Sequence, residues 1–364
     1  MEPQRSRLAV SLKREIMTMN ADIKQDIGRR LLQSWLMVSD QKKVSRIVSL
    51  QEEKLRSVYR IYFTGSHPSI IAKLCLTEDA EHEYQMYSEV LPSLTIQGVQ
   101  VYGCVPDTGS AKSPKKKSWL FMEDILGAPY DCSNSTHQRL AGRWLAQLHT
   151  SSGKGAKPDY IRERSTAFYA PHVQTAVDML VQHRSDTKLS GNDRQVLSRI
   201  YEFFRKLETH WDKIEKFCRD MPQTLMHADF KDDNMFVVDS GREPVLVVFD
   251  WSCVGWGAPA LDVAKFMGYG VSPDLRSYLE VCKQHWPHVD EAAIVRLGYI
   301  GEIFRFIHTV RWDAEYFNYG YPETAMSCMR IYDTWFQEID TVQPWIDTDL
   351  VSSGKFTPMK KAWH

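Results

Sequence analysis

The chain has 364 residues, 43% of them hydrophobic, which is enough for one large domain or two medium-sized domains with buried cores. Its 45 basic and 46 acidic side chains nearly cancel, which argues against a protein drawn by charge to nucleic acid or to an anionic membrane. Seven scattered cysteines without a CxxC pair indicate reduced thiols. No apolar run approaches the ~20 residues that span a membrane, and the N-terminus lacks a signal-peptide core, so a cytoplasmic protein is expected.

The N-terminal third predicts helices followed by a small antiparallel sheet. Apolar residues recur at helical spacing over residues 8–38, and alternation of β-branched and aromatic residues then predicts strands. The expected strands are residues 44–50, 57–64, 68–76, 99–105 and 118–125. One helix is expected at 78–90, and the small, basic segment 107–117 is expected to be a solvent-exposed loop.

From residue 135 onward the apolar period becomes helical, with one exception. The runs MFVV (235–238) and PVLVVFD (244–250), separated by the turn DSGRE, predict a β-hairpin. The expected fold class is α+β, with a small antiparallel five-stranded N-lobe and a mainly helical C-lobe. The expected boundaries are 1–40 for an N-terminal helical segment, 41–125 for the N-lobe and linker strand, 126–345 for the C-lobe, and 346–364 for a tail.

The octet HADFKDDN (227–234) and Asp250 lie at the two ends of the predicted hairpin. Phosphoryl transfer from a nucleotide needs a cation on the phosphates, oxygen ligands for Mg²⁺ and a group that orients the attacking hydroxyl. Asp229 is suited to act as the catalytic base, and Lys231 to neutralise charge on the transferred group. Asn234 and Asp250 offer hard oxygen ligands for Mg²⁺. The alternative interpretation of the octet is a polar turn whose side chains bind their own backbone.

Lys73 interrupts the otherwise apolar strand IIAKLCL, where a lysine is expected to have a partner. The following helix offers Glu83, with Glu81 as the rival partner. A Lys73–Glu83 pair would hold the ammonium group over the α- and β-phosphates of a nucleotide. The alternative is a lysine that extends along an exposed strand face.

The segments IIAKLCL, AEHEYQMY, LFMEDILG, HADFKDDN, VVFDW and GAPALDVAKF together resemble the aminoglycoside phosphotransferase and choline kinase-like family. This resemblance extends over roughly residues 40–340 and implies a two-lobed protein-kinase-like fold. It implies that Lys73 binds the phosphates with Glu83 as its partner. It also implies that Asp229 is the catalytic base and that Asn234 and Asp250 bind Mg²⁺. It further implies that the backbone of Glu123 and Ile125 binds adenine, that Met122 lies beside the base, and that Asp262 braces the catalytic loop.

Three features depart from common kinase patterns. The turn SLQEEKLRS (49–57) has no glycine where many kinases have a glycine-rich phosphate loop, and Glu52 and Glu53 would repel a phosphate unless they point away. Lys231 stands where small-molecule kinases of this family commonly have another residue, and it resembles protein kinases. The tripeptide FDW replaces the protein-kinase DFG, which favours the small-molecule branch.

The expected activity is ATP- and Mg²⁺-dependent phosphorylation of a small-molecule hydroxyl, in an aminoglycoside-like antibiotic, an amino alcohol or a sugar, with GTP as the alternative nucleotide. In such folds the acceptor lies between the catalytic loop and the helices that follow. The candidate acceptor residues there are Glu302, Arg305, His308, Arg311, Trp312, Asp313, Glu315, Tyr316 and Phe317. Of these, Trp312, Tyr316 and Phe317 are candidates for an apolar or cation-accepting wall, and Asp313 or Glu315 for binding an amine. The alternative is that this helix only packs the core and faces water.

Two other functions stay open at this point. A protein kinase is suggested by the lysine of the octet, but an APE-like segment and a long activation loop are missing. A non-catalytic nucleotide-binding scaffold is suggested by the glycine-free turn. No nucleic-acid or membrane partner is expected.

Overall fold

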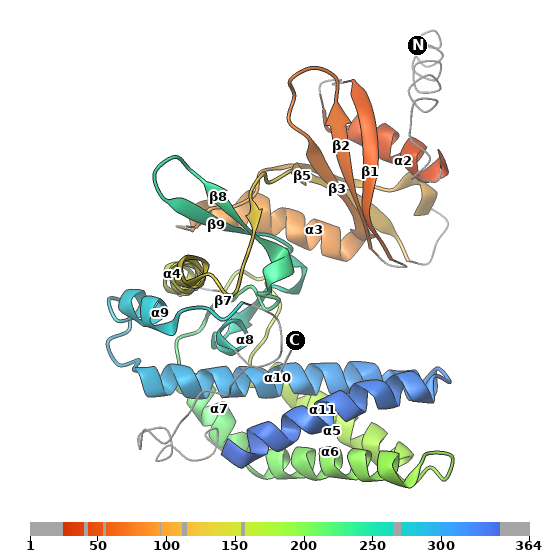
Figure 1. Ribbon diagram of the computed structural model, residues 1–364, viewed down its shortest axis with the longest axis vertical. Helices are drawn as coiled ribbons and strands as arrows, with labels where there is room; N and C mark the ends of the chain where they lie inside the picture. Colours follow the sequence, from red (N-terminus) through yellow and green to blue (C-terminus); the bar gives the residue numbers. More distant parts are fainter. Residues whose placement is uncertain are drawn as a thin grey trace. The chain divides into compact units, whose positions relative to one another are not determined.

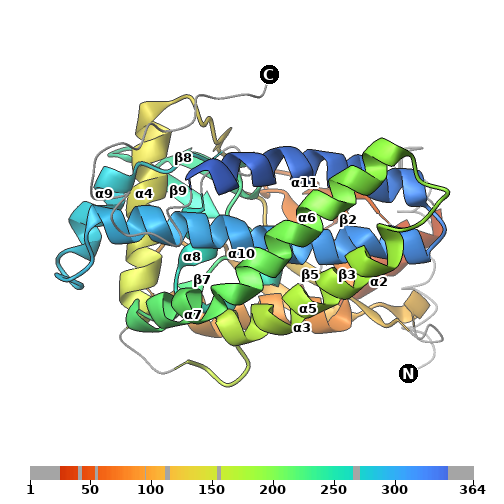
Figure 2. The same ribbon diagram turned by 90° about the horizontal axis from the view of Figure 1, so that it is seen from below.

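In the computed structural model the chain forms two compact units (Figures 1 and 2). The structure describes residues 25–39, 43–53, 56–94, 96–110, 115–153, 157–264 and 271–342. Unit 1 comprises Met1–Pro129 and Asn234–Ser252, and unit 2 comprises Tyr130–Asp233 and Cys253–His364. The expected tail at 346–364 and the expected helix before residue 25 lie outside the described residues.

Unit 1 contains the predicted five-stranded antiparallel sheet, in the order β1-β2-β3-β5-β4. Its strands are β1 (Val44–Glu52), β2 (Ser57–Phe63), β3 (Ile70–Leu76), β4 (Val101–Pro106) and β5 (Lys117–Glu123). These bounds agree with the alternating runs of β-branched and aromatic residues, so the predicted N-lobe sheet is confirmed. The turn between β1 and β2 is the glycine-free segment, and it returns the chain to β2 through a hydrogen bond from the Glu53 N–H to the Arg56 carbonyl at 2.8 Å.

The two faces of this sheet meet different helices (Figure 1). On one face, Leu31 and Trp35 of α2 (Gln25–Trp35) join a buried apolar cluster with Ala72 and Leu74 of β3. Because successive strand residues point to opposite faces, Lys73 points to the other face, where α3 (Thr77–Gln85) packs. The predicted helix at 78–90 is present, but its last turn, Met86–Val90, is π-helical, with the wider turn of i→i+5 hydrogen bonding.

The second sheet of unit 1 contains the predicted hairpin. It is formed by β6 (Ala128–Pro129), β8 (Met235–Asp239) and β9 (Pro244–Val248), in the order β6-β8-β9. Gly241 in the connecting turn has φ of +78°, a conformation that glycine adopts without steric cost. By its contacts this hairpin belongs with the N-terminal sheet, although the sequence predicted it within the C-lobe range 126–345.

Unit 2 is mainly helical, as expected. Its helices are α4 (Ser135–Ser152), α5 (Thr166–His183), α6 (Gly191–Thr209), α7 (Trp211–Asp220), α8 (Ala260–Val263), α9 (Leu275–Cys282), α10 (Glu291–Asn318) and α11 (Pro322–Val342). Helices α5, α6, α10 and α11 lie side by side, as both views show, while α4 packs on α9 and on the short strand β7 (Thr224–Met226). Strand β7 pairs with β10 (Gly255–Gly257), and neither three-residue strand was predicted, because such short segments have no readable period.

Close backbone contact joins α10 to α8. A Cβ atom on Gly301 of α10 would lie 2.0 Å from the carbonyl oxygen of Ala260, so glycine is required for this crossing. The same helix begins at a capping residue, Asp290, whose carboxylate accepts a hydrogen bond from the Ala293 N–H at 2.8 Å. Among the described helices, none is long and apolar enough to cross a membrane.

Candidate active site

The buried lysine of β3 lies between two carboxylates of unit 1. Lys73 Nζ is 2.6 Å from Glu83 Oε2 and 2.7 Å from Asp250 Oδ1, and all three residues are buried. Glu81, the rival partner, instead lines a hollow between α3 and β4. The structure thus contains the predicted Lys73–Glu83 pair, and it adds Asp250, which is 177 residues from Lys73 in the chain.

The charges in this cluster follow from burial and from the ion pairs. Burial by itself raises the pKa of Asp250, but the attraction of Lys73 and Arg56 outweighs it and holds this pKa well below its usual range. Burial lowers the pKa of Lys73, and the two carboxylates more than compensate, so this pKa lies above its usual value. Burial raises the pKa of Glu83 in spite of Lys73. Asp250 is therefore ionised and Lys73 is protonated near neutral pH.

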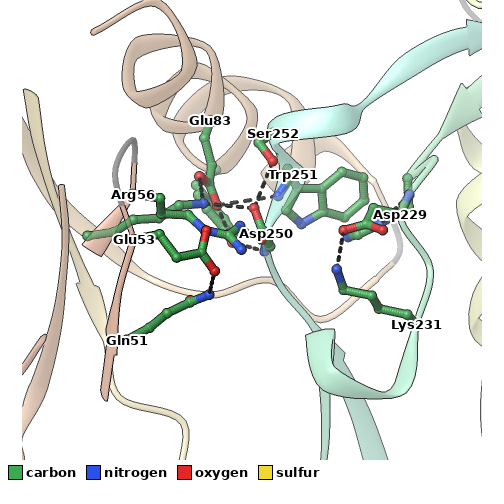
Figure 3. Close-up of polar contacts among 12 residues, drawn as sticks. Gln51, Glu53, Arg56, Glu83, Asp229, Lys231, Asp250, Trp251 and Ser252 are labelled. Carbon is green, nitrogen blue, oxygen red and sulfur yellow. Dashed lines mark hydrogen bonds and ion pairs between the residues drawn. The ribbon is translucent and has the colours of Figure 1, made fainter. Parts of the chain in front are cut away.

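Side chains of unit 1 also hold the backbone at Asp250, which has φ of 65° in the left-handed region that few residues other than glycine adopt. The Asp250 N–H donates to the Tyr87 hydroxyl at 3.2 Å, and the Trp251 N–H donates to Glu83 Oε1 at 3.3 Å. The Ser252 hydroxyl donates to Asp250 Oδ1 at 2.8 Å (Figure 3). Such locally strained backbone, held by its surroundings, is typical of functional sites.

Sequence reasoning missed Arg56, which follows the glycine-free β1–β2 turn. Its Nη1 donates to Asp250 Oδ2 at 2.8 Å, and Figure 3 shows the guanidinium beside this carboxylate. Glu52 and Glu53 accept hydrogen bonds from Ser49 and Gln51 at 3.1 and 2.5 Å, so both carboxylates have partners within their own strand and turn. The sequence signal that could have identified Arg56 is its position, a cationic residue at the turn where many kinases bring backbone amides close to a phosphate.

Asn234 and Asp250 flank the same end of the β8–β9 hairpin. Met235 pairs with Val248, and the Asn234 carbonyl accepts a hydrogen bond from the Phe249 N–H at 3.0 Å. Both residues are nearly buried, with 5% and 9% of their surface exposed, and both have oxygen atoms of the kind that Mg²⁺ prefers. No group of three or more His, Cys, Asp or Glu side chains suited to a metal occurs among the described residues. A metal here would therefore complete its shell with water and phosphate oxygens, as Mg²⁺ usually does.

In unit 2, the buried Asp262 at α8 fixes the start of the octet. Its two carboxylate oxygens accept hydrogen bonds from the N–H groups of His227 and Ala228, each at 2.7 Å. His149 Nε2 lies 3.1 Å from the same carboxylate, and His149 Nδ1 lies 2.9 Å from the Tyr278 hydroxyl. Burial alone raises the pKa of Asp262, but the hydrogen bond with His149 leads the effects that lower it below its usual value. The contact with His149, on the apolar face of α4, was not predicted.

The octet places Asp229 and Lys231 in contact. Lys231 Nζ is 2.9 Å from Asp229 Oδ2, and 22% of the Asp229 side chain and 25% of the Lys231 side chain are exposed (Figure 3). His227 Nδ1 accepts a hydrogen bond from the Asp229 N–H at 3.3 Å, and its ring packs against Trp144. His227 therefore braces the loop, while the Asp229 carboxylate remains accessible.

The end of β5 contains the residues for which the family resemblance implies adenine binding. Met122 is buried, and the Glu123 N–H donates to the Gln100 carbonyl at 2.8 Å. Asp124 is buried and accepts hydrogen bonds from side chains of β2 and of the β2–β3 turn. These contacts anchor the segment that leads to Ile125, and its role in binding adenine stays a prediction.

Three of the acceptor residues expected on α10 have different surroundings. Trp312 is 57% exposed, whereas Phe317 stacks on His183 of α5 with centroids 4.5 Å apart. Asp313, the expected amine ligand, accepts a hydrogen bond from the Tyr332 hydroxyl of α11. The described contacts thus separate the expected acceptor residues among different neighbours.

The phosphotransferase enzyme family model matches residues 53–294. A GDP complex of an aminoglycoside 2'-phosphotransferase IIIa variant aligns with 12% identity and a TM-score of 0.63, over 88% of this chain and 100% of that chain. A microcompartment-associated aminopropanol kinase aligns with 14% identity and a TM-score of 0.58, over 89% and 100% of the two chains. Choline kinase from Cryptosporidium parvum aligns with 11% identity and a TM-score of 0.53, over 90% and 96%.

At these identities the structural matches establish the fold, which is the expected two-lobed kinase-like α+β fold. No curated protein matches the sequence. The family match confirms the predicted resemblance and the predicted class of enzyme, a kinase of small molecules. Because this match runs from the β1–β2 turn into α10, over more than half of the chain, the chain belongs to the phosphotransferase enzyme family.

Proposed function

We propose that this enzyme transfers the γ-phosphoryl group of ATP to a hydroxyl of a small molecule, with Asp229 as catalytic base. The observation that best supports the proposal is the buried contact of Lys73 with both Glu83 and Asp250. Burying three ionisable groups costs stability unless they are well paired, and this arrangement leaves a rigid cation and an ionised carboxylate. Those are the groups that phosphoryl transfer needs at the nucleotide phosphates and at the metal.

In this proposal Lys73 neutralises the α- and β-phosphates, and Asn234 with Asp250 holds Mg²⁺. The bound metal would offset the charge that develops on the β- and γ-phosphate oxygens. Glu83 keeps the Lys73 ammonium group in position, since its Oε2 contacts Nζ at 2.6 Å and its Oε1 is bound by the Trp251 N–H. In the same proposal, the backbone of Glu123 and Ile125 binds the adenine base, and Met122 lies beside it.

Arg56 replaces the missing glycine-rich loop in this proposal. Its guanidinium pairs with Asp250 at 2.8 Å, and 32% of its side chain is exposed. Occupation of Asp250 by the metal would release Arg56, which would then bind a phosphate oxygen. A guanidinium suits this role because it remains charged and presents several donors in a planar fork.

On the acceptor side, Asp229 aligns the hydroxyl and takes its proton as the oxygen attacks phosphorus. The bond between the γ-phosphorus and its bridging oxygen breaks, and the electron pair leaves with ADP. Lys231, 2.9 Å from Asp229, limits the build-up of negative charge around the transferred group. Asp262 supports the step indirectly, because it holds the two backbone N–H groups that precede Asp229.

The structurally similar enzymes are named for an aminoglycoside, aminopropanol and choline, all molecules with hydroxyl groups. This supports a hydroxyl acceptor for the present chain. One of these structures is a GDP complex, so GTP remains the alternative nucleotide to be tested beside ATP.

The proposal is tested by separating nucleotide binding from transfer. With Mg²⁺ and ATP or GTP, mass spectrometry should detect a phosphorylated product from a panel of aminoglycosides, amino alcohols, sugars and hydroxy acids. Asp229→Ala should abolish transfer but leave nucleotide binding, measured by calorimetry, nearly unchanged. Asp250→Ala should also weaken Mg-nucleotide binding, because it removes a metal ligand.

Asp178→Ala is the matched control, since Asp178 is an exposed aspartate on α5. It should leave both measurements unchanged. Equal loss of nucleotide binding in Asp229→Ala and Asp250→Ala would refute the separate roles. Nucleotide binding without transfer to any acceptor would favour the non-catalytic scaffold.

A further inference from the structure

Four basic side chains gather on unit 2, here named the α5–α10 basic cluster: Arg164, His172, His308 and Arg311. The Arg164 guanidinium carbon lies 4.5 Å from the ring centroid of Phe168, and that ring lies 4.8 Å from His172. The imidazoles of His172 on α5 and His308 on α10 lie edge to face, with centroids 6.5 Å apart. Arg311 follows His308 by one turn of α10. Residues from three chain segments therefore converge at one place.

Acidic side chains do not neutralise this cluster. Among the described residues Arg164 forms no ion pair, and its Nε is buried without a hydrogen-bond partner. Within the described part of the chain, Arg311 pairs only with Glu315, at 3.9 Å, which is beyond hydrogen-bond distance. Among the described residues, the Glu315 carboxylate beside Arg311 is thus the one ion-pair partner of the two guanidinium groups, so the cluster stays positive even when both imidazoles are neutral.

Repulsion within the cluster also contributes to the pKa values of both histidines. His308 is exposed on α10, and partial loss of solvation together with repulsion from Arg164, His172 and Arg311 lowers its pKa below the usual value. Loss of solvation and the two arginines also lower the pKa of His172. A bound anion would reverse this repulsion and give Arg164 a partner.

The cluster is built on the same framework as the catalytic loop. The Arg164 N–H donates to the Trp256 carbonyl in β10 at 2.8 Å, and β10 pairs with β7, which ends one residue before the octet. On α10, Arg305 lies one turn before the cluster and donates to the Leu261 carbonyl at 2.7 Å. Leu261 adjoins Asp262, which holds the loop through its carboxylate. The basic cluster and Asp229 therefore share one supporting structure within unit 2.

We propose that the α5–α10 basic cluster binds an anionic group of the acceptor, either a carboxylate or a phosphate. The preferred substrates are then hydroxyl-bearing organic anions, in contrast to the amine-bearing molecules for which the similar structures are named. Trp312, which is 57% exposed and stacks beside His308 at 6.4 Å, supplies an apolar surface next to the anion. The anion keeps its charge during the reaction, while the acceptor hydroxyl loses its proton to Asp229. This inference rests on the proposed phosphoryl transfer.

Matched acceptors of similar size but different charge test the inference kinetically. Glycerol, glycerate, glycerol 3-phosphate and 3-amino-1,2-propanediol form one series, and glucose, gluconate, glucose 6-phosphate and glucosamine form another. We expect kcat/KM for an anionic member to exceed those of its neutral and amine counterparts by about tenfold or more, the effect of one hydrogen bond to a charged group. A higher kcat/KM for the carboxylate members of the two series indicates a carboxylate site, and a higher kcat/KM for the phosphate members indicates a phosphate site.

Substitutions in the cluster test whether its arginines cause the preference for anionic acceptors. Arg311→Met should remove most of the advantage of the anion while leaving KM for the nucleotide unchanged, and Arg164→Met should act in the same way if it folds. Arg219→Met is the control, because Arg219 is an exposed arginine of α7 outside the cluster. A preference for the neutral or amine acceptor, or an unchanged preference in Arg311→Met, would overturn the inference.

A binding measurement separates this inference from the proposed function. Inorganic phosphate and malate are titrated into the full chain, and the imidazole NMR signals of His172 and His308 are identified through His172→Gln and His308→Gln. We expect saturable shifts of both signals, which Arg311→Glu abolishes. Signals that stay in place with both anions would refute the anion site. Saturable shifts without phosphoryl transfer to any acceptor would instead refute the proposed function and leave the anion site standing.

Discussion

Replacing Arg56 with alanine should change metal binding and nucleotide binding in opposite directions. Its guanidinium is 2.8 Å from Asp250, with 32% of the Arg56 side chain and 11% of the Asp250 side chain exposed. Fully exposed ion pairs contribute about 0–1 kcal/mol, and the partial exposure of this one places it near the upper end, at about 1 kcal/mol. Since 1.4 kcal/mol corresponds to a factor of ten, Arg56→Ala should tighten metal binding to the nucleotide-free protein by about fivefold.

The same change should weaken binding of the nucleotide, because a hydrogen bond from Arg56 to a phosphate is lost. Hydrogen bonds to charged groups contribute about 1.5–3 kcal/mol, so the dissociation constant of Mg-ATP should rise by about ten- to a hundredfold. Manganese binding followed by electron paramagnetic resonance and nucleotide binding followed by calorimetry measure the two effects. Arg46→Ala, at an exposed arginine of β1, is the control. Changes of both affinities in the same direction would refute the exchange of Arg56 between Asp250 and phosphate.

Two further predictions concern stability. Asp262→Asn removes a buried charge that accepts two backbone hydrogen bonds and should cost about 3–5 kcal/mol of unfolding free energy, together with a loss of kcat. The folded-state pKa values of Asp262 and Asp250 are depressed, so the stability that these carboxylates contribute is present above their unfolded pKa of about 3.9 and is lost as the pH falls from there through the folded pKa. In urea titrations at different pH values, Asp262→Asn should therefore reduce the loss of unfolding free energy at acid pH. Gly301→Val should destabilise unit 2 by about 1–3 kcal/mol or more, because even a Cβ atom would lie 2.0 Å from a backbone oxygen. The control Gly191→Ala should not destabilise it, because no atom lies within 4 Å of the added Cβ. Equal losses of unfolding free energy in the two variants would contradict the close packing of α10 on α8.

Much of the fold could be predicted because its signals are local. Alternation along β1, β2 and β3 and the 3.6-residue period of the helices are properties of neighbouring residues, and both survive in the structure. The π-helical turn Met86–Val90 and the three-residue strands β7 and β10 could not be predicted, because packing rather than local periodicity decides them. The grouping of the β8–β9 hairpin with the N-terminal sheet likewise depends on contacts between distant segments.

For the candidate site, too, some features could be predicted from the sequence and others depend on the tertiary structure. By itself the sequence determined which chemical groups are present and their spacing: a lysine inside an apolar strand, an aspartate and an asparagine five residues apart, and an aspartate after a hairpin. Only the tertiary structure decided their partners, because ion pairs such as Lys73–Asp250 and Arg56–Asp250 join residues 177 and 194 positions apart and depend on strand register and burial. The same holds for the α5–α10 basic cluster, whose members come from separate segments and whose charge excess depends on which acidic side chains pack elsewhere.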